Sequence, residues 1–260
     1  MGSAHSSNRG GSRRRGVPTK LQPAVQAAPK QLALAIGAGR NDTGKLRELL
    51  PSVVHIGGWL DLDAQRELVA DFREWAAPPA GLRHPAMPTG HLMSVQSVCL
   101  GWHWQPYAYS RTADDTDGAP VKPLPTKVAE LACAAVDAAY GAGTSKATRF
   151  QPDAAIVNLY SPDAHLGLHQ DGEEPSDAPV VTISLGDACI FRMAGVDRRT
   201  GPFVDVEFRS GDLIVFGGAN RRIFHGVPRI LADTAPDELG LPPGRLSITV
   251  RETGLPNDAP

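Results

Sequence analysis

A series of short β-rich runs in the C-terminal part of the chain limits the possible folds more than any other feature of the sequence. After Gln151, seven runs of four to seven residues, rich in β-branched and aromatic side chains, are separated by turn-forming residues. Many short strands at this spacing are typical of a double-sheet sandwich or jelly roll. The runs are Ala154–Tyr160, Val180–Leu185, Cys189–Met193, Phe203–Phe208, Leu213–Phe216, Arg221–His225 and Arg245–Arg251.

Two amphipathic helices are predicted ahead of these strands. The first covers residues 60–75, where apolar side chains recur at helical spacing and Asp61 or Asp63 can cap the start. The second covers residues 126–140 and ends at Gly141. We therefore predict an α+β fold in which N-terminal helices buttress a C-terminal double-sheet barrel.

The first 40 residues differ from the rest in composition and charge. They are rich in Ser, Gly, Arg, Pro, Ala and Gln, and seven basic residues precede the first acidic residue, Asp42. A segment with so few large apolar side chains cannot offset the entropy of ordering, so we predict a disordered basic tail over 1–40 and one domain over 41–260. That domain has 19 basic and 28 acidic residues, so attraction to a polyanion would need a local basic patch or the tail.

Cysteine usage and hydropathy bear on the cellular compartment. Cys99, Cys133 and Cys189 are odd in number and widely spaced, which indicates neither a disulfide framework nor a thiolate zinc site. No apolar run approaches the ~18 residues of a membrane span. We expect a soluble, cytoplasmic monomer with no membrane contact.

Three residues form a candidate metal site. His169 and Asp171 stand two residues apart, and His225 follows 54 residues after Asp171. In an extended chain, residues i and i+2 face the same way about 6.6 Å apart, so this pair can converge on one ion with a histidine from a distant strand. Two imidazoles and one carboxylate are the facial ligand set of non-haem iron(II) oxygenases. The pattern alone also fits polar residues at the edge of a loop.

A second constellation lies in the run of residues 245–251, where apolar and polar side chains alternate strictly. An ordinary half-exposed edge strand would show the same pattern. If the polar face instead lines a barrel that holds the metal site, Arg245 and Arg251 can bracket a dicarboxylate, because a buried guanidinium needs an anionic partner. An iron site beside two arginines describes a 2-oxoglutarate pocket. The polar face consists of Arg245, Ser247, Thr249 and Arg251, and the apolar face of Leu246, Ile248 and Val250.

An ordered series of motifs runs through residues 50–254. The motifs are Met93-Ser94, Leu100–Trp102, Asn158–Pro175, Ile183–Gly186, Gly211–Gly218, Phe224–Gly226 and Arg245–Arg251. In their order and spacing they resemble the AlkB family. The resemblance implies a double-stranded β-helix that uses iron(II), dioxygen and 2-oxoglutarate to hydroxylate an N-methyl group on a base. The hydroxymethyl adduct then decomposes to formaldehyde and the repaired base.

The same resemblance implies roles for individual residues. His169, Asp171 and His225 would hold the iron and, with Arg251, form the catalytic set. The residues implied for 2-oxoglutarate are Asn158, Tyr160, Arg245, Ser247 and Arg251. Ser247 departs from the family, whose best-known member has asparagine there, and this departure affects the detailed geometry around the cosubstrate.

A substrate-recognition lid is implied for residues 78–125, ahead of a β-barrel core over about 151–254. Trp102 would stack on a flipped base opposite His169, and Tyr107 would contact the strand that carries the lesion. Glu173 would accept a hydrogen bond from the exocyclic amine of the base. Gly172 replaces a basic residue of the family, and the loop between Trp102 and Tyr107 is two residues shorter, so substrate preference is open.

The leading interpretation is oxidative demethylation of 1-methyladenine- and 3-methylcytosine-type lesions in single-stranded or base-flipped DNA or RNA. The preferred lesion and polymer, and any role of the tail, are left open. This interpretation predicts positive charge around a concave mouth. Candidates for that charge in or near the lid are Arg73, Arg83, His84, His91, His103, Arg111 and Lys122.

Two alternatives remain at this stage. The first is a dioxygenase that acts on a protein, a tRNA or a small metabolite, distinguished by whether Trp102 faces the iron. The second is a non-enzymatic metal-binding β-barrel or nucleic-acid-binding module. It is disfavoured because it leaves Arg245 and Arg251 without a partner.

Overall fold

A computed structural model describes residues 45–144 and 149–256 of the chain. The chain divides into two units, Met1–Gln31 and Leu32–Pro260, and the described residues all belong to the second. The tail predicted over residues 1–40 lies outside the described residues.

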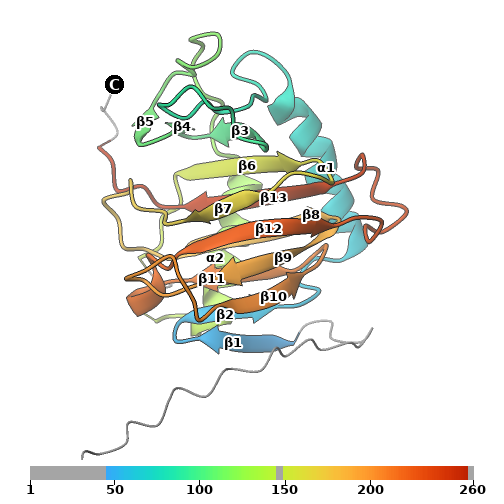
Figure 1. Ribbon diagram of the computed structural model, residues 1–260, viewed down its shortest axis with the longest axis vertical. Helices are drawn as coiled ribbons and strands as arrows, with labels where there is room; N and C mark the ends of the chain where they lie inside the picture. The colour runs from blue at the N-terminus through green and yellow to red at the C-terminus, as the bar shows by residue number, and fades with distance from the viewer. Residues whose placement is uncertain (1–44, 145–148, 257–260) are drawn as a thin grey trace, which may run out of the picture. The chain divides into compact units, whose positions relative to one another are not determined.

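Two antiparallel sheets form the body of the protein (Figure 1). The larger sheet contains seven strands: β1 (Leu46–Leu50), β2 (Val53–Ile56), β3 (Gln96–Leu100), β6 (Ala154–Tyr160), β8 (Val180–Gly186), β11 (Leu213–Phe216) and β13 (Arg245–Arg251). The smaller contains four: β7 (Leu166–His169), β9 (Ala188–Met193), β10 (Val204–Phe208) and β12 (His225–Leu231). Their spatial orders are β1-β2-β11-β8-β13-β6-β3 and β10-β9-β12-β7.

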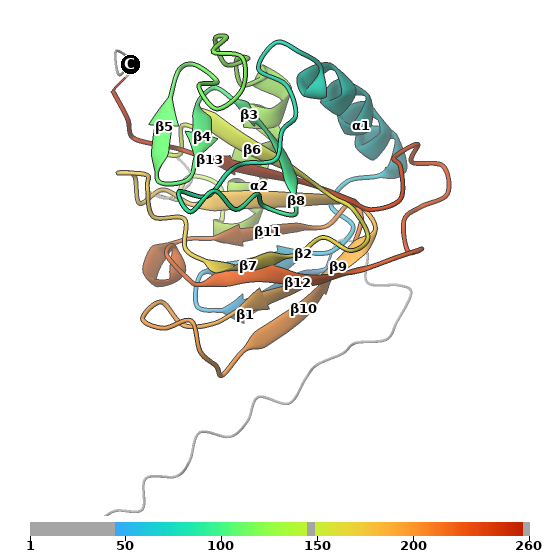
Figure 2. The ribbon, with the colours of Figure 1, turned by 45° about the horizontal axis from the view of Figure 1, so that its top comes forward.

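Sequence neighbours thus lie in different sheets, as β7 and β8 do, which is the connectivity of a jelly roll and confirms the predicted fold class. One apolar cluster contains side chains of both sheets, including Val180 and Phe216 from the larger and Cys189 and Phe191 from the smaller. Figure 2 shows the two sheets facing each other. The interior between them is where a site can be buried.

Two helices cover the outer face of the larger sheet, as predicted. They are α1 (Leu62–Ala76) and α2 (Thr126–Tyr140). Asp61 caps α1 by accepting a hydrogen bond from the backbone N–H of Ala64 at 2.9 Å, and Gly141 ends α2 with a φ of 89°. A second apolar cluster joins their inner faces to the sheet. None of the described helices is long and apolar enough to cross a membrane.

The strand predictions were largely confirmed, with one error. Residues 154–160, 213–216 and 245–251 are strands with the predicted bounds. The run Arg221–His225 was wrongly predicted, because β12 only begins at its last residue. The Arg221 guanidinium is buried and donates to the carbonyl oxygens of Ala178 and Asp171, which holds the segment in a turn after the 3-10 helix η1 (Gly218–Asn220).

The range predicted as a lid, residues 78–125, contains structures of two kinds. Strand β3 within it pairs with β6 and forms the edge of the larger sheet. Strands β4 (His103–Gln105) and β5 (Ala108–Ser110) form a separate hairpin that follows β3. The lid boundaries therefore include one strand of the barrel.

Candidate active site

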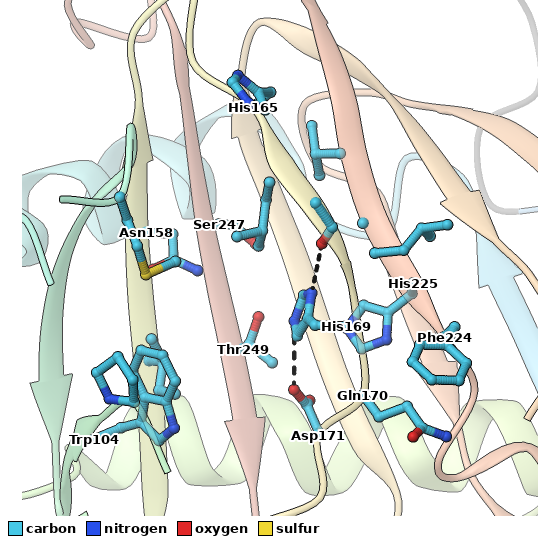
Figure 3. Close-up of a pocket in the computed structure, with 18 of the residues that line it drawn as sticks. Trp104, Asn158, His165, His169, Gln170, Asp171, Phe224, His225, Ser247 and Thr249 are labelled. Carbon is cyan, nitrogen blue, oxygen red and sulfur yellow. Dashed lines mark hydrogen bonds and ion pairs between the residues drawn. The ribbon is translucent and has the colours of Figure 1, made fainter. Parts of the chain in front are cut away.

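The three predicted metal ligands come together at the junction of β7 and β12. His169 ends β7 and pairs in register with His225, the first residue of β12, while Asp171 follows two residues after His169. One ligand atom from each of these side chains lies within 4.8 Å of the other two (Figure 3). The predicted convergence of His169 and Asp171 with a histidine from a distant strand is thus present, and their role as metal ligands stays a prediction.

The hydrogen bonds of the two histidines leave the correct nitrogen free for a metal. Nδ1 of His169 lies 3.0 Å from the carbonyl oxygen of Gly167, and Nδ1 of His225 lies 3.0 Å from that of Ile223. A carbonyl oxygen only accepts, so in both rings Nδ1 carries a proton, which leaves Nε2 as the nitrogen available to a metal. Burial, followed by the nearby His169, lowers the pKa of His225 to about 4, so this ring is neutral at physiological pH.

The Asp171 carboxylate is held in its charged form. Burial raises its pKa, but the positive charge of Arg251 outweighs burial and leaves the pKa well below its usual value. Nη2 of Arg251 lies 3.0 Å from Oδ2 of Asp171, which is an ion pair, although Oδ2 makes no well-directed hydrogen bond. The ion pair holds without that hydrogen bond, because charge attraction tolerates poor angles better than a hydrogen bond does.

The polar face of β13 lines the cavity beside these ligands, as the alternation predicted. The cavity has a volume of about 710 Å³. Leu246, Ile248 and Val250 point the other way into the apolar cluster under the helices. The four side chains of the polar face are Arg245, Ser247, Thr249 and Arg251, and Asn158 and Tyr160 of the adjacent β6 line the same wall.

Arg245 has the features of an anion receptor. The residue is 1% exposed, and its Nε donates to the Ser184 hydroxyl at 2.9 Å. Its Nη2 is buried and has no hydrogen-bond partner, and no carboxylate among the described residues forms an ion pair with it. The guanidinium also lies over the rings of Tyr160 and Phe208, 5.1 and 5.3 Å from their centroids. Because a buried guanidinium without a carboxylate partner is costly, the residue fits a carboxylate of 2-oxoglutarate.

Arg251 differs from Arg245 because it already has two carboxylate partners. It pairs with Asp171 and donates to Oε1 of Glu174 at 2.8 Å, and its Nε remains buried without a partner. Tyr109 of β5 donates to the same Glu174 oxygen at 2.5 Å. The hairpin is therefore linked to a metal ligand through Glu174 and Arg251, a connection that the sequence did not indicate.

The prediction that Trp102 stacks on a base is wrong. Trp102 is 0% exposed and does not line the cavity. Its indole N–H donates to Asp153 at 3.2 Å, and the Arg111 guanidinium covers its ring at 3.4 Å from the centroid. The Trp102 ring is thus completely buried, and neither of its faces is accessible to a base.

Trp104, two residues further on, occupies the position assigned to Trp102. It lines the cavity, and Figure 3 shows its ring across the cavity from His169. The sequence contained a sign of this, because the loop between Trp102 and Tyr107 is two residues shorter than in the family. With such a gap, either Trp102 or Trp104 can be aligned with the tryptophan of the family. Tyr107 and Glu173 also line the cavity, and Tyr107 is 68% exposed at the hairpin turn. Their roles toward a substrate remain predictions.

Of the seven residues expected to supply positive charge around the mouth, His91 lines the cavity, whereas most of the others are engaged elsewhere. Arg83 and His103 both pair with Asp115, and the Lys122 ammonium donates to backbone carbonyl oxygens. Arg111 covers Trp102. Besides the arginines of β13, the described cavity wall contains one further arginine, Arg199.

Comparison with known proteins agrees with this geometry. The sequence profile of the 2OG-Fe(II) oxygenase superfamily matches residues 52–251. AlkB of Escherichia coli K12, named as an alpha-ketoglutarate-dependent dioxygenase, is 34% identical over 198 residues, which are 74% of this chain and 86% of that protein. The solved structure of OsALKBH1 superposes with a TM-score of 0.72 at 32% identity and covers 80% of this chain and all of that one.

A plant protein named DNA N(6)-methyladenine demethylase ALKBH1D, from Arabidopsis thaliana, is 35% identical over 228 residues. These residues are 80% of this chain and 51% of the plant protein. The chain thus spans about half the length of this relative.

Proposed function

We propose a reaction for this chain from the premise that it belongs to the 2OG-Fe(II) oxygenase superfamily and, within it, to the AlkB family. Iron(II), 2-oxoglutarate and dioxygen are the cofactors of this superfamily, and the described residues fit them. His169, Asp171 and His225 would hold the iron. Arg245, together with Asn158, Tyr160, Ser247 and Arg251, would hold the cosubstrate.

The proposed reaction is the oxidative removal of an N-methyl group from a nucleic-acid base. Bound iron(II) would supply the activation of dioxygen. One oxygen atom ends in succinate as 2-oxoglutarate loses carbon dioxide, and the other is inserted into a C–H bond of the methyl group. The hydroxyl proton of the resulting hydroxymethyl group is then lost, the C–N bond breaks and formaldehyde leaves. The bond's electron pair stays on the base nitrogen, and from the cationic 1-methyladenine and 3-methylcytosine the proton goes to solvent. The observation that carries this proposal is a buried guanidinium without a carboxylate partner in the same cavity as a two-histidine, one-carboxylate cluster.

The form of the substrate is part of the same proposal. The ligand cluster lines the wall of the cavity, so a base must leave its helix to reach it, which favours single-stranded nucleic acid or a flipped base. One chain supplies every candidate metal ligand and cosubstrate residue, so the proposed reaction as a monomer does not require a partner subunit. The three cysteines are free, which supports a reducing compartment such as the cytoplasm.

Formaldehyde release tests the proposed function. With Fe(II), 2-oxoglutarate and ascorbate, we expect equal amounts of formaldehyde and succinate from single-stranded oligonucleotides that carry 1-methyladenine or 3-methylcytosine. N6-methyladenine DNA and methylated tRNA form further arms of the panel, because relatives are named for these substrates. Unmethylated oligonucleotide is the control. Succinate without formaldehyde on every arm would indicate a different substrate class.

Replacing Trp102 by alanine should reduce mainly the stability of the protein, whereas replacing Trp104 should reduce mainly its activity. Trp102→Ala should lower the free energy of unfolding by about 3–5 kcal/mol, the usual cost of emptying a core aromatic site. Trp104→Ala should leave thermal melting nearly unchanged while demethylation falls by about one to two orders of magnitude, as loss of ~1–3 kcal/mol of stacking implies. Denaturant unfolding and formaldehyde assays on both variants check this. Equal effects of the two substitutions on stability would contradict the assignment of Trp104.

A further inference from the structure

Four side chains that the proposed reaction does not use form a polar cluster beneath Trp104. We name Arg83, Cys99, His103 and Asp115 the positioning cluster. Nε of Arg83 lies 2.9 Å from both carboxylate oxygens of Asp115, and Nε2 of His103 lies 2.6 Å from Oδ1 of the same residue. Arg83, Cys99 and His103 are buried, and the Asp115 side chain is 18% exposed.

The cluster contacts the backbone of Trp104 at both of its polar groups. The Trp104 N–H donates to Sγ of Cys99 at 3.3 Å. The Trp104 carbonyl oxygen accepts from Nη2 of Arg83, and it also lies 3.7 Å from Sγ of Cys99. Nη1 of Arg83 in turn lies 3.8 Å from the same sulfur. The peptide groups on either side of the Trp104 Cα are therefore held by side chains from outside the hairpin.

The charges of the cluster reinforce these contacts. Burial alone would raise the pKa of the Cys99 thiol, but its hydrogen bond with His103 and the charge of Arg83 outweigh burial and lower it. Burial would lower the pKa of His103, yet the bonds to Cys99 and Asp115 raise it. Sulfur and imidazole thus polarise each other, which makes Cys99 a stronger acceptor for the Trp104 N–H.

Because β4 is a strand, holding the backbone of Trp104 also fixes the direction of its side chain. Gly101, with a φ of 78°, turns the chain between β3 and β4, and a Cβ there would collide with the carbonyl oxygen of Asp153. Successive side chains of β4 point to opposite faces, so His103 enters the cluster while Trp104 faces the cavity. A change that lets β4 rotate would move the indole ring away from its place across from His169.

We propose that Arg83, Cys99, His103 and Asp115 act as positioning residues that set the orientation of Trp104 and thereby the affinity of the site for a planar base. The effect on substrate rests on the proposed demethylase function, whereas the effect on Trp104 does not. Cys99 is the central member, because its sulfur meets both polar groups of the Trp104 backbone. Its replacement tests the cluster with the smallest change in volume.

Fluorine NMR tests the orientation of Trp104 without a substrate. The chain contains four tryptophans, so 5-fluorotryptophan labelling gives four signals, and Trp104→Phe assigns the relevant one. In Cys99→Val we expect the Trp104 signal to move, split or broaden beyond its own linewidth, while the Trp59 signal stays in place. Cys99→Ser, whose hydroxyl can still accept the N–H, should restore it. Cys133→Val, on α2, is the control, and an unchanged Trp104 signal in Cys99→Val would overturn the proposal.

A double-mutant cycle tests the consequence for the reaction. Cys99→Val should raise KM for the methylated oligonucleotide about tenfold, since a ~1 Å misplacement of a group can cost up to ~100-fold. In a Trp104→Ala background the same change should have no further effect, because the cluster acts only through that ring. Additive losses would overturn the proposal. If Cys99→Val folds poorly, Asp115→Asn takes its place in both experiments with the same expectations.

The two experiments separate two kinds of failure. If the wild-type protein demethylates none of the oligonucleotides, the proposed function fails, and the fluorine signals still decide whether the cluster orients Trp104. If the wild-type protein is active but Cys99→Ser and Cys99→Val behave alike in both experiments, the hydrogen bond to sulfur has no role and the proposal fails alone.

Discussion

Replacing His225 by alanine is expected to abolish turnover and to weaken Fe(II) binding by more than the ~10–100-fold that follows loss of an outer-shell partner. The reason is the geometry of the site. His225 supplies one of only three candidate ligands among the described residues, and its Nδ1–H is already bonded to Ile223, so no other orientation serves. Anaerobic titration with Fe(II) and a succinate assay measure the two losses.

The control for this experiment is His84→Ala. His84 lies outside the cavity wall, with Nδ1 2.9 Å from the carbonyl oxygen of Met93, so its loss should leave iron affinity and turnover as they are. Circular dichroism must show that His225→Ala is folded. Full activity of His225→Ala at low added iron would remove His225 from the metal site.

Replacing Arg245 by methionine should weaken the binding of 2-oxoglutarate without lowering the stability of the ligand-free protein. Loss of a charge-assisted, buried pair should weaken 2-oxoglutarate binding by about 2–5 kcal/mol. That range corresponds to roughly 30-fold to several thousand-fold in Kd. The ligand-free protein should melt no lower than the wild type, because the change removes a buried charge without a carboxylate partner and keeps the volume. Titration calorimetry and thermal melting without ligand check the two halves.

Arg192→Met is the matched control for this substitution. Arg192 also lies on a strand, β9, but it is partly exposed and already paired with Asp205 at 2.7 Å. Its removal should leave 2-oxoglutarate affinity unchanged and have little effect on stability. If Arg245→Met keeps wild-type affinity for 2-oxoglutarate, the carboxylate of the cosubstrate binds elsewhere, and Arg251 with its unpartnered Nε is the next candidate.

Features with local causes were predictable from the sequence. The bounds of β13 followed from alternation, because a strand places successive side chains on opposite faces whatever surrounds it. The start and end of α2 followed from Pro125 and Gly141, which act on the backbone within one turn. The two-residue spacing of His169 and Asp171 predicted their convergence for the same reason.

Features with distant causes were not predictable in this way. The turn at Arg221 depends on carbonyl oxygens 43 and 50 residues away. The lid arginine Arg83 lost its expected surface role because Asp115, 32 residues later, neutralises it. Neither partner is marked by any periodicity near the residue that it controls.

Trp102 and Trp104 show most directly what could be predicted from the sequence and what depended on the tertiary structure. The sequence by itself, through the family motif Leu100–Trp102, indicated that a tryptophan of this stretch lies near the metal site. Which of the two rings enters the cavity was decided by Asp153, which binds the Trp102 indole, and by the cluster that anchors the Trp104 backbone. These contacts arise from segments brought together only when the sheets close, so the choice between two neighbouring tryptophans is a property of the folded barrel.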